Sequence, residues 1–105
     1  MTETALSAAI TTALEQLGYW VIRLNSGKVK GRRGWIHLCP AGTPDLMVLM
    51  PCVLADPGTV LFLEVKLPGG KASAEQEAWH QRARRMGHRV SIVSSVREAI
   101  KEVGR

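Results

Sequence analysis

The sequence predicts an α/β domain in which helices flank a mixed β-sheet. The predicted order is helix, strand, strand, strand, helix, strand, helix (α-β-β-β-α-β-α). Two observations support it. Two long segments repeat apolar residues every three or four positions, and short runs rich in β-branched and aromatic residues lie between glycines and prolines. With 105 residues, 46% of them hydrophobic, the chain is expected to fold as one domain spanning residues 1–105.

Three segments are predicted to be helical. Residues 2–17 place apolar side chains on one face, and Gly18 ends this helix. A second helix follows Ser73, the expected N-cap, and ends at Gly87. A short third helix spans residues 96–103 near the end of the chain. These helices supply the layers expected to cover the sheet.

The strands are predicted from aromatic and β-branched runs. The main segments are residues 19–24, 46–50, 60–67 and 89–93, and residues 35–39 are a candidate for a further short strand. The run 60–67 is apolar on both faces over most of its length. It is therefore expected to be a central strand that is covered on two sides.

The chain carries a basic segment in its first half. No acid lies between Glu15 and Asp45, and this interval contains four cations close together: Lys28, Lys30, Arg32 and Arg33. Glycines among them predict a mobile loop, which suits contact with phosphates. The net charge of +5 also favours a polyanionic partner, nucleic acid before membrane. A solvated loop without a partner is the alternative.

Further cations cluster near the end of the second helix. Arg82 and Arg85 are candidates for contacts with a phosphate backbone, or they stabilise the helix C-terminus by charge. Cys39 and Cys52 are too few for a zinc site or a disulfide framework, and both are expected to be buried and reduced. No apolar run approaches the roughly 18 residues of a membrane span, and no basic signal-peptide start is present, so a cytoplasmic protein is expected.

Two of the predicted strands each carry acid at one end. Asp45 opens the run 46–50, whereas Glu64 and Lys66 lie near the end of the run 60–67. Alternate strand residues share a face, so Glu64 and Lys66 are expected on the same face. Two carboxylates with a nearby lysine suit a hard divalent cation such as Mg²⁺ or Mn²⁺. The alternative is that Asp45 caps a turn and Glu64 forms a weak ion pair with Lys66.

These motifs resemble a known nuclease family. The segments Gly42-Thr43-Pro44-Asp45-Leu46 and Glu64-Val65-Lys66, followed by Gln76 and Trp79, are similar to the VRR-Nuc (virus-type replication-repair nuclease) family of the PD-(D/E)XK nuclease superfamily. The likeness covers nearly the whole chain. It implies a restriction-endonuclease-like core and a metal-dependent endonuclease that hydrolyses DNA phosphodiester bonds.

Roles follow for the motif residues. Asp45 and Glu64 are assigned as ligands of Mg²⁺ or Mn²⁺, and the resemblance adds the backbone carbonyl of Val65. Lys66 is expected to orient or deprotonate the attacking water, or to stabilise charge on the phosphate.

Two further residues have competing interpretations. Gln76 is expected to position water or Lys66, yet it is also the third residue of a possible capping box with Ser73. The resembled superfamily often has a first-helix acid near the metal, where Glu3 lies in this sequence. Glu3 is predicted to face inward as an outer ligand, or it complements the helix dipole. Trp79 is interpreted as a core residue, and the three histidines, His37, His80 and His88, as surface or hydrogen-bonded residues without a catalytic role.

The substrate and assembly are also predicted. The chain shows no base-reading motif, which favours a structure-selective enzyme over a sequence-specific one. The resemblance points to four-way junctions or flaps in phage or bacterial replication and repair, in a bacterial cell or a phage-infected host. A homodimer is expected, since a two-fold-symmetric junction requires two sites, with an interface near residues 51–54 or around Trp35. A non-catalytic nucleic-acid-binding module and a nuclease-fold subunit of a larger assembly are the alternatives.

Overall fold

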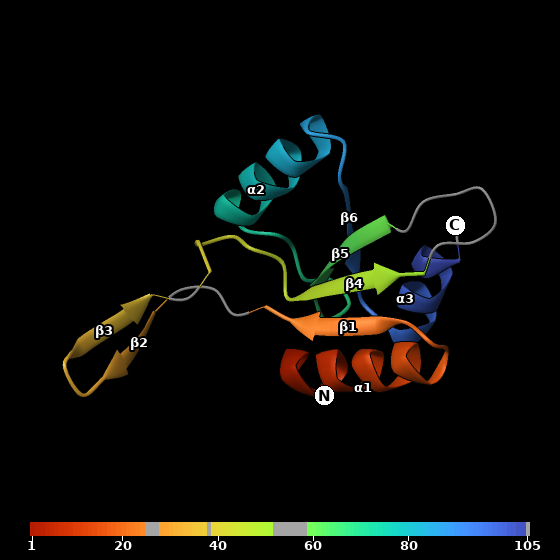
Figure 1. Cartoon of the computed structure of the whole chain (residues 1–105), viewed down its shortest axis with the longest axis horizontal. Coiled ribbons are helices and arrows are strands. Elements are labelled where there is room, and N and C mark those ends of the chain that lie inside the picture. Colours follow the sequence, from red (N-terminus) through yellow and green to blue (C-terminus); the bar gives the residue numbers. More distant parts are fainter. Residues whose placement is uncertain (25–27, 38, 52–58, 105) are drawn as a thin grey trace.

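The computed structural model describes residues 1–24, 28–37, 39–51 and 59–104, of which 28–30 and 35–37 are described by their backbone only (Figure 1). The elements follow one another along the chain as α1 (Glu3–Gln16), β1 (Trp20–Arg23), β2 (Lys28–Gly31), β3 (Gly34–His37), β4 (Leu46–Met50), β5 (Thr59–Val65), α2 (Ala74–Arg85), β6 (Arg89–Val93) and α3 (Val96–Val103). The α/β class is confirmed.

The main sheet is mixed, as predicted. Its four strands lie in the order β1-β4-β5-β6. The pairs β1–β4 and β4–β5 are antiparallel, whereas β5 and β6 are parallel and α2 connects them. The strand β5 therefore lies between two others, and its predicted central position is confirmed.

The sheet separates two layers of helices. Figure 1 shows α1 and α3 on one side and α2 on the other. Alternate residues of β5 point to opposite faces. Leu61, Leu63 and Val65 are fully buried in the core that α1 and α3 complete, and α1 contributes Leu6, Ile10 and Leu14 to it. Val60, Phe62 and Glu64, which alternate with them, face α2.

The predicted boundaries are close to those observed. Thr2 and Ser73 cap α1 and α2 by accepting backbone N–H bonds, and the bounds of β4 and β6 match those predicted. The strand β5 ends at Val65, two residues early, although the Lys66 N–H still bonds to the Val93 carbonyl at 3.0 Å. Lys66 thus follows the strand directly instead of lying within it.

The prediction that the basic segment forms a loop is wrong. Residues 28–37 form an antiparallel hairpin, β2–β3, in which Gly31 pairs with Gly34 across a two-residue turn. Gly34 has a φ of +122°, which glycine adopts without strain. Arg32 and Arg33 lie at this turn and are exposed, and Lys28 and Lys30 lie on β2. Figure 1 shows the hairpin standing apart from the main sheet.

Other sequence-based expectations have mixed outcomes. Cys39 is a free, half-buried thiol, whereas Cys52 lies outside the described residues. In the described part of the chain, no helix has the length and apolar character that crossing a membrane requires.

Candidate active site

The two predicted acids meet at one end of the β4–β5 pair. Met47 pairs with Phe62 and Leu46 with Leu63, so the same antiparallel register places Asp45 opposite Glu64. Both carboxylates then project from the face of the sheet that α2 covers. Two residues 19 positions apart in sequence thereby become neighbours, as the metal-site prediction required.

Asp45 is fixed by the strands on both of its sides. Its Oδ2 accepts a hydrogen bond of 2.7 Å from the backbone N–H of Val65, and its carbonyl accepts one of 2.8 Å from the N–H of Leu24. The side chain of Asp45 also interacts with that of Glu64. The bond from Val65 therefore orients this half-buried carboxylate beside the second acid.

The turn before Asp45 packs against the start of α2. Gly42 has a φ of +89°, and a Cβ at this position would collide with the backbone carbonyl of Glu75. Thr43 closes the turn, because its Oγ1 donates a 2.6 Å hydrogen bond to the Pro40 carbonyl. The Gly-Thr-Pro-Asp motif is thus a tight turn that holds Asp45 beside the first turn of α2.

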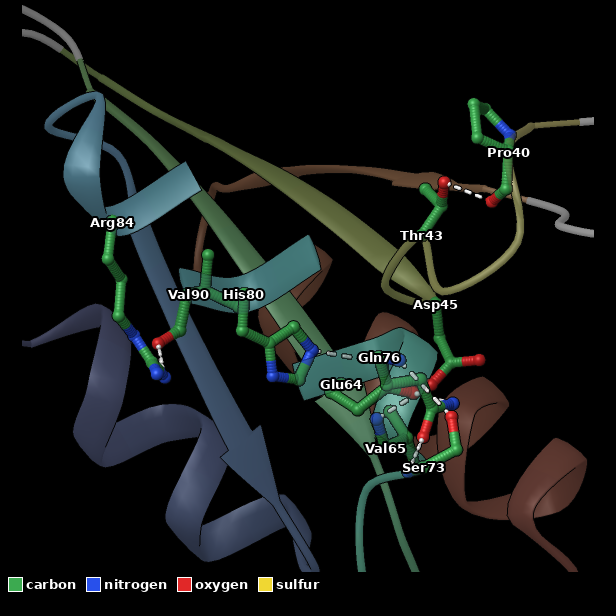
Figure 2. Close-up of polar contacts among 10 residues, drawn as sticks. All are labelled: Pro40, Thr43, Asp45, Glu64, Val65, Ser73, Gln76, His80, Arg84 and Val90. Carbon is green, nitrogen blue, oxygen red and sulfur yellow. Dashed lines mark hydrogen bonds and ion pairs between the residues drawn. The ribbon is translucent and has the colours of Figure 1, made fainter. Parts of the chain in front are cut away.

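Glu64 lies at the centre of the polar contacts that Figure 2 shows. Its side chain is almost completely buried, with 1% exposure. The Nε2 of Gln76 donates to its Oε2 at 3.2 Å, and the Nε2 of His80 lies 3.2 Å from its Oε1. Both carboxyl oxygens therefore have a partner on α2, as a buried polar group requires.

Gln76 completes the capping box and also contacts Glu64, whereas its role in positioning water or Lys66 stays a prediction. Its Oε1 accepts the Ser73 N–H at 2.8 Å, and its own N–H donates to the Ser73 hydroxyl at 3.2 Å, which completes the capping box. The same amide group donates from its nitrogen to Glu64. The start of α2 and the buried acid are therefore linked through one side chain.

The electrostatics of the site are those of a buried acid pair with Lys66 as a nearby counter-charge. Burial, and then the neighbouring Asp45, raise the pKa of Glu64 to about 8, while the charge of Lys66 opposes the shift. Burial lowers the pKa of His80, as does the cation of Arg84. Both shifts favour the neutral forms of the two groups that meet in this contact.

The sequence interpretation assigned His80 no part in the site. The structure shows a hydrogen-bonded histidine, as expected, but places it at 2% exposure against Glu64. The signal was present: His80 follows Gln76 by four positions, so both lie on one face of the helix. If Gln76 on this face points toward Glu64, then His80, one turn later on the same face, is expected to point toward Glu64 as well.

The remaining predicted residues differ in their proximity to the acids. Lys66 is half-buried and lies near enough to Glu64 to lower its pKa. Glu3 is exposed instead of facing inward, yet its charge raises the pKa of Glu64, which places it on the same side of the molecule. Arg82 and Arg85 are exposed on α2, two to three turns beyond Gln76, and do not join the acids.

Comparison with known proteins identifies the family of this chain. The VRR-NUC domain family model matches residues 1–97. The chain belongs to the VRR-NUC domain family. A solved structure described as a VRR_NUC domain superposes with a TM-score of 0.69, covering 98% of this chain and 95% of that chain at 24% identity, a likeness that establishes the fold. No curated protein matches the chain. Membership of the family makes this a nuclease-type domain.

The site of this VRR-NUC domain fits a cation that keeps part of its water shell. Among the described residues, no group of three or more His, Cys, Asp and Glu could enclose a metal. Mg²⁺ commonly takes only one or two carboxylates, with water and substrate phosphate completing its coordination. Asp45 and Glu64 would supply that donor set, and a bound cation would favour the ionised form of Glu64, whose pKa is raised by burial and by the neighbouring Asp45.

Proposed function

We propose that this VRR-NUC domain is a Mg²⁺- or Mn²⁺-dependent endonuclease that hydrolyses DNA phosphodiester bonds. The observation that carries the proposal is the convergence of Asp45 and Glu64 at one end of β4 and β5, with Gln76 bonded to Glu64. Burying a carboxyl beside a second carboxyl is energetically costly, and groups perturbed in this way cluster at functional sites, where they bind cations or transfer protons.

Each side chain has a task in this proposal. When bound, a divalent cation lowers the pKa of water and neutralises charge on a phosphate. Asp45 and Glu64 would hold it, with the Val65 carbonyl as a third donor and Glu3 as an outer ligand. Lys66, which adjoins Glu64, orients the attacking water or stabilises the phosphate. Gln76 and His80 hold Glu64 in place.

The proposed substrate is branched DNA, such as a four-way junction or a flap, in phage or bacterial replication and repair within the cytoplasm. Support comes from the β2–β3 hairpin, which stands apart from the sheet and has exposed Arg32 and Arg33 at its turn. A two-stranded hairpin alone is marginally stable in water, and a groove of DNA admits a two-stranded ribbon. Contacts of its cations with phosphates would carry little sequence information, which favours recognition of DNA shape.

We also propose a homodimer, because a two-fold-symmetric junction is cut symmetrically by two related sites. Trp20 on the edge strand β1 is 64% exposed, which leaves apolar surface for association. Of the predicted interface, residues 52–54 lie outside the described residues, and Trp35 belongs to β3, where only the backbone is described. Light scattering at micromolar concentration would give the mass of the particle.

The test of the function is a set of labelled duplex, single-strand, flap and four-way-junction DNAs incubated with Mg²⁺ or Mn²⁺. The Asp45→Asn variant is expected to reduce cleavage by at least about 100-fold, because it removes a charged ligand. Lys66→Ala is expected to reduce cleavage to a comparable degree. Glu15→Gln is the matched control, since Glu15 is an exposed acid at the far end of α1 from Glu3.

Three outcomes would contradict the proposal. Cleavage that survives in purified Asp45→Asn protein would come from a different site or a contaminant. Cutting of plain duplex at one sequence would replace shape selection with base reading. An absence of cleavage with both cations, together with an absence of Mn²⁺ binding in calorimetry, would favour a non-catalytic binding module or a subunit that is active only in an assembly.

A further inference from the structure

An apolar pocket adjoins the acid pair on the same face of the sheet. It has a volume of about 500 Å³, within the range of about 300–1,000 Å³ typical of small-molecule sites. Met47 of β4 and Phe62 of β5 form part of its lining, and Trp79 and Met86 of α2 contribute to the wall. The rings of Phe62 and Trp79 meet edge to face with centroids 5.1 Å apart, so the pocket contains an ordered aromatic pair.

The register of the strands fixes how close this pocket is to the acids. Met47 pairs with Phe62, and Asp45 and Glu64 each lie two residues from this pair along their strands. Two residues of a strand span roughly 6.6 Å, so the pair of Met47 and Phe62 and the pair of Asp45 and Glu64 are immediate neighbours on one face. On α2 the order is the same: Gln76 contacts Glu64, and Trp79, one turn later, contacts Phe62. The phosphate to be cleaved would lie at the cation that Asp45 and Glu64 hold. A nucleotide next to that phosphate can therefore reach the pocket.

The rim of the pocket has the charge that suits a nucleotide. Arg82 and His88 belong to its lining, both are exposed, and the described lining includes no acid. Met86 is also largely exposed, so this apolar surface is open to solvent. An apolar, aromatic interior with a cationic rim matches a base that stacks while its phosphate stays at the edge.

From these observations, and resting on the proposed DNA-cleaving function, we propose that the pocket of Phe62, Trp79 and Arg82 binds an unpaired nucleobase adjoining the cleaved phosphate. The occupant is a nucleotide that branched DNA presents unstacked at a fork or flap. Stacking on aromatic side chains recognises any base, so the pocket selects for unpaired structure and not for sequence. Trp79 is then a binding residue as well as part of the packing between α2 and the sheet.

The test measures binding in EDTA, where no metal-dependent cleavage takes place. The probes are a fluorescent blunt hairpin duplex and the same duplex with a short oligo-dT extension. The wild-type protein is expected to bind the extended probe more tightly, by roughly fivefold to 150-fold, the range of one base–aromatic stack. Trp79→Leu should abolish this preference and leave the affinity for the blunt probe unchanged. Arg82→Ala should weaken binding of the extended probe and reduce its salt dependence by about one counterion.

Two matched controls separate the pocket from general effects. Leu17→Ala removes an exposed apolar side chain at the end of α1, and Arg97→Ala removes an exposed cation on α3; both helices cover the opposite face of the sheet. Both variants should keep the wild-type preference. Circular dichroism checks folding. If Trp79→Leu does not fold, photocrosslinking of 5-iodouracil at the unpaired position decides on wild-type protein, with Trp79 or Phe62 as the expected site.

The outcomes distinguish this inference from the proposed function. A preference that depends on Trp79 supports the pocket even if the domain cleaves nothing. An equal affinity of wild-type protein for both probes overturns it, as does a crosslink that maps elsewhere. A change of particle mass in Trp79→Leu, with the preference intact, overturns it in favour of a second copy of the chain covering the pocket.

Discussion

The two faces of the sheet are built from the same strands but differ in what covers them. On β5, Leu61, Leu63 and Val65 are fully buried beneath α1 and α3. On the other face, Val60 and Phe62 are partly exposed beside the buried Glu64. A helix is about 10 Å wide and strands lie about 4.8 Å apart, so α2 alone covers roughly two of the four strands.

This difference explains why the chemistry lies on the α2 face. Two helices cover most of one face, and that face provides most of the apolar burial that stabilises the fold. The single helix on the other face leaves space beside it for a site and a pocket. Stability and site chemistry can be separated at neighbouring residues, because Leu63 and Glu64 point in opposite directions. Substitutions at these two positions should therefore affect different measurements.

The largest expected effect on stability comes from the closed face. Leu63→Ala should lower the free energy of unfolding by about 2–5 kcal/mol, because it removes buried methyl groups and leaves a cavity. Val60→Ala, on the partly open face, should lower it by about 1 kcal/mol or less. Urea denaturation followed by circular dichroism measures both. Equal losses in the two variants would show that the faces do not differ in this way.

A pH dependence should mark the α2 face. Glu64 has a pKa of about 8 when folded, against an ordinary value of 4.5. Its contribution to stability is complete below pH 4.5 and declines until the pH passes about 8. His80 acts in the opposite sense around its ordinary pKa of 6.5, so the decline is clearest above pH 7.

Metal-free protein should therefore lose stability between pH 7 and 8 with a slope of up to about 1.4 kcal/mol per pH unit. Denaturant titrations in EDTA across this interval measure the slope. Glu64→Gln, which has no proton to lose, should flatten the profile. A wild-type profile as flat as that of the variant would mean that Glu64 is already ionised in the folded protein.

The effect expected on cleavage at His80 is smaller than that of Asp45→Asn. Replacement by leucine should reduce cleavage by about 10–100-fold, since partners that orient a metal ligand contribute on this scale. His80→Gln should recover part of the loss, because its amide can donate to the Oε1 of Glu64. Single-turnover rates against Mn²⁺ concentration separate weaker metal binding from slower chemistry. Identical rates for the leucine and glutamine variants would exclude an orienting role.

Much of the main fold was predictable because its elements carry strong local signals. The apolar periodicity of α1 and the capping pair of Ser73 and Gln76 located two helices to within two residues. The hairpin was missed because residues 28–34 are rich in lysine, arginine and glycine, which lack strand alternation and have low strand propensity. The pairing of β2 with β3 depends on the two-residue turn between them, and the periodicity of apolar residues carries no information about that turn.

The site was predictable in its acids but not in its partners. Asp45 and Glu64 could be selected because acids are unusual at the ends of apolar strands. Their alignment opposite each other needed the register of β4 and β5, which sequence alone does not set. The contact of His80 with Glu64 depends on the rotation of α2 against the sheet. Long-range packing fixes that rotation. The local sequence pattern therefore predicted only that Gln76 and His80 share one face of the helix.

The amide of Gln76 has one further consequence. Its oxygen receives the N–H of Ser73 and its nitrogen donates to Glu64, so only one of the two orientations of the amide group satisfies both neighbours. A glutamate here would keep the cap but place an acceptor against an acceptor, and a lysine would keep the donor but lose the cap. An asparagine is too short to span both. Only glutamine can therefore make both contacts at this position. Its presence is a more specific indicator of a functional site than either acid alone.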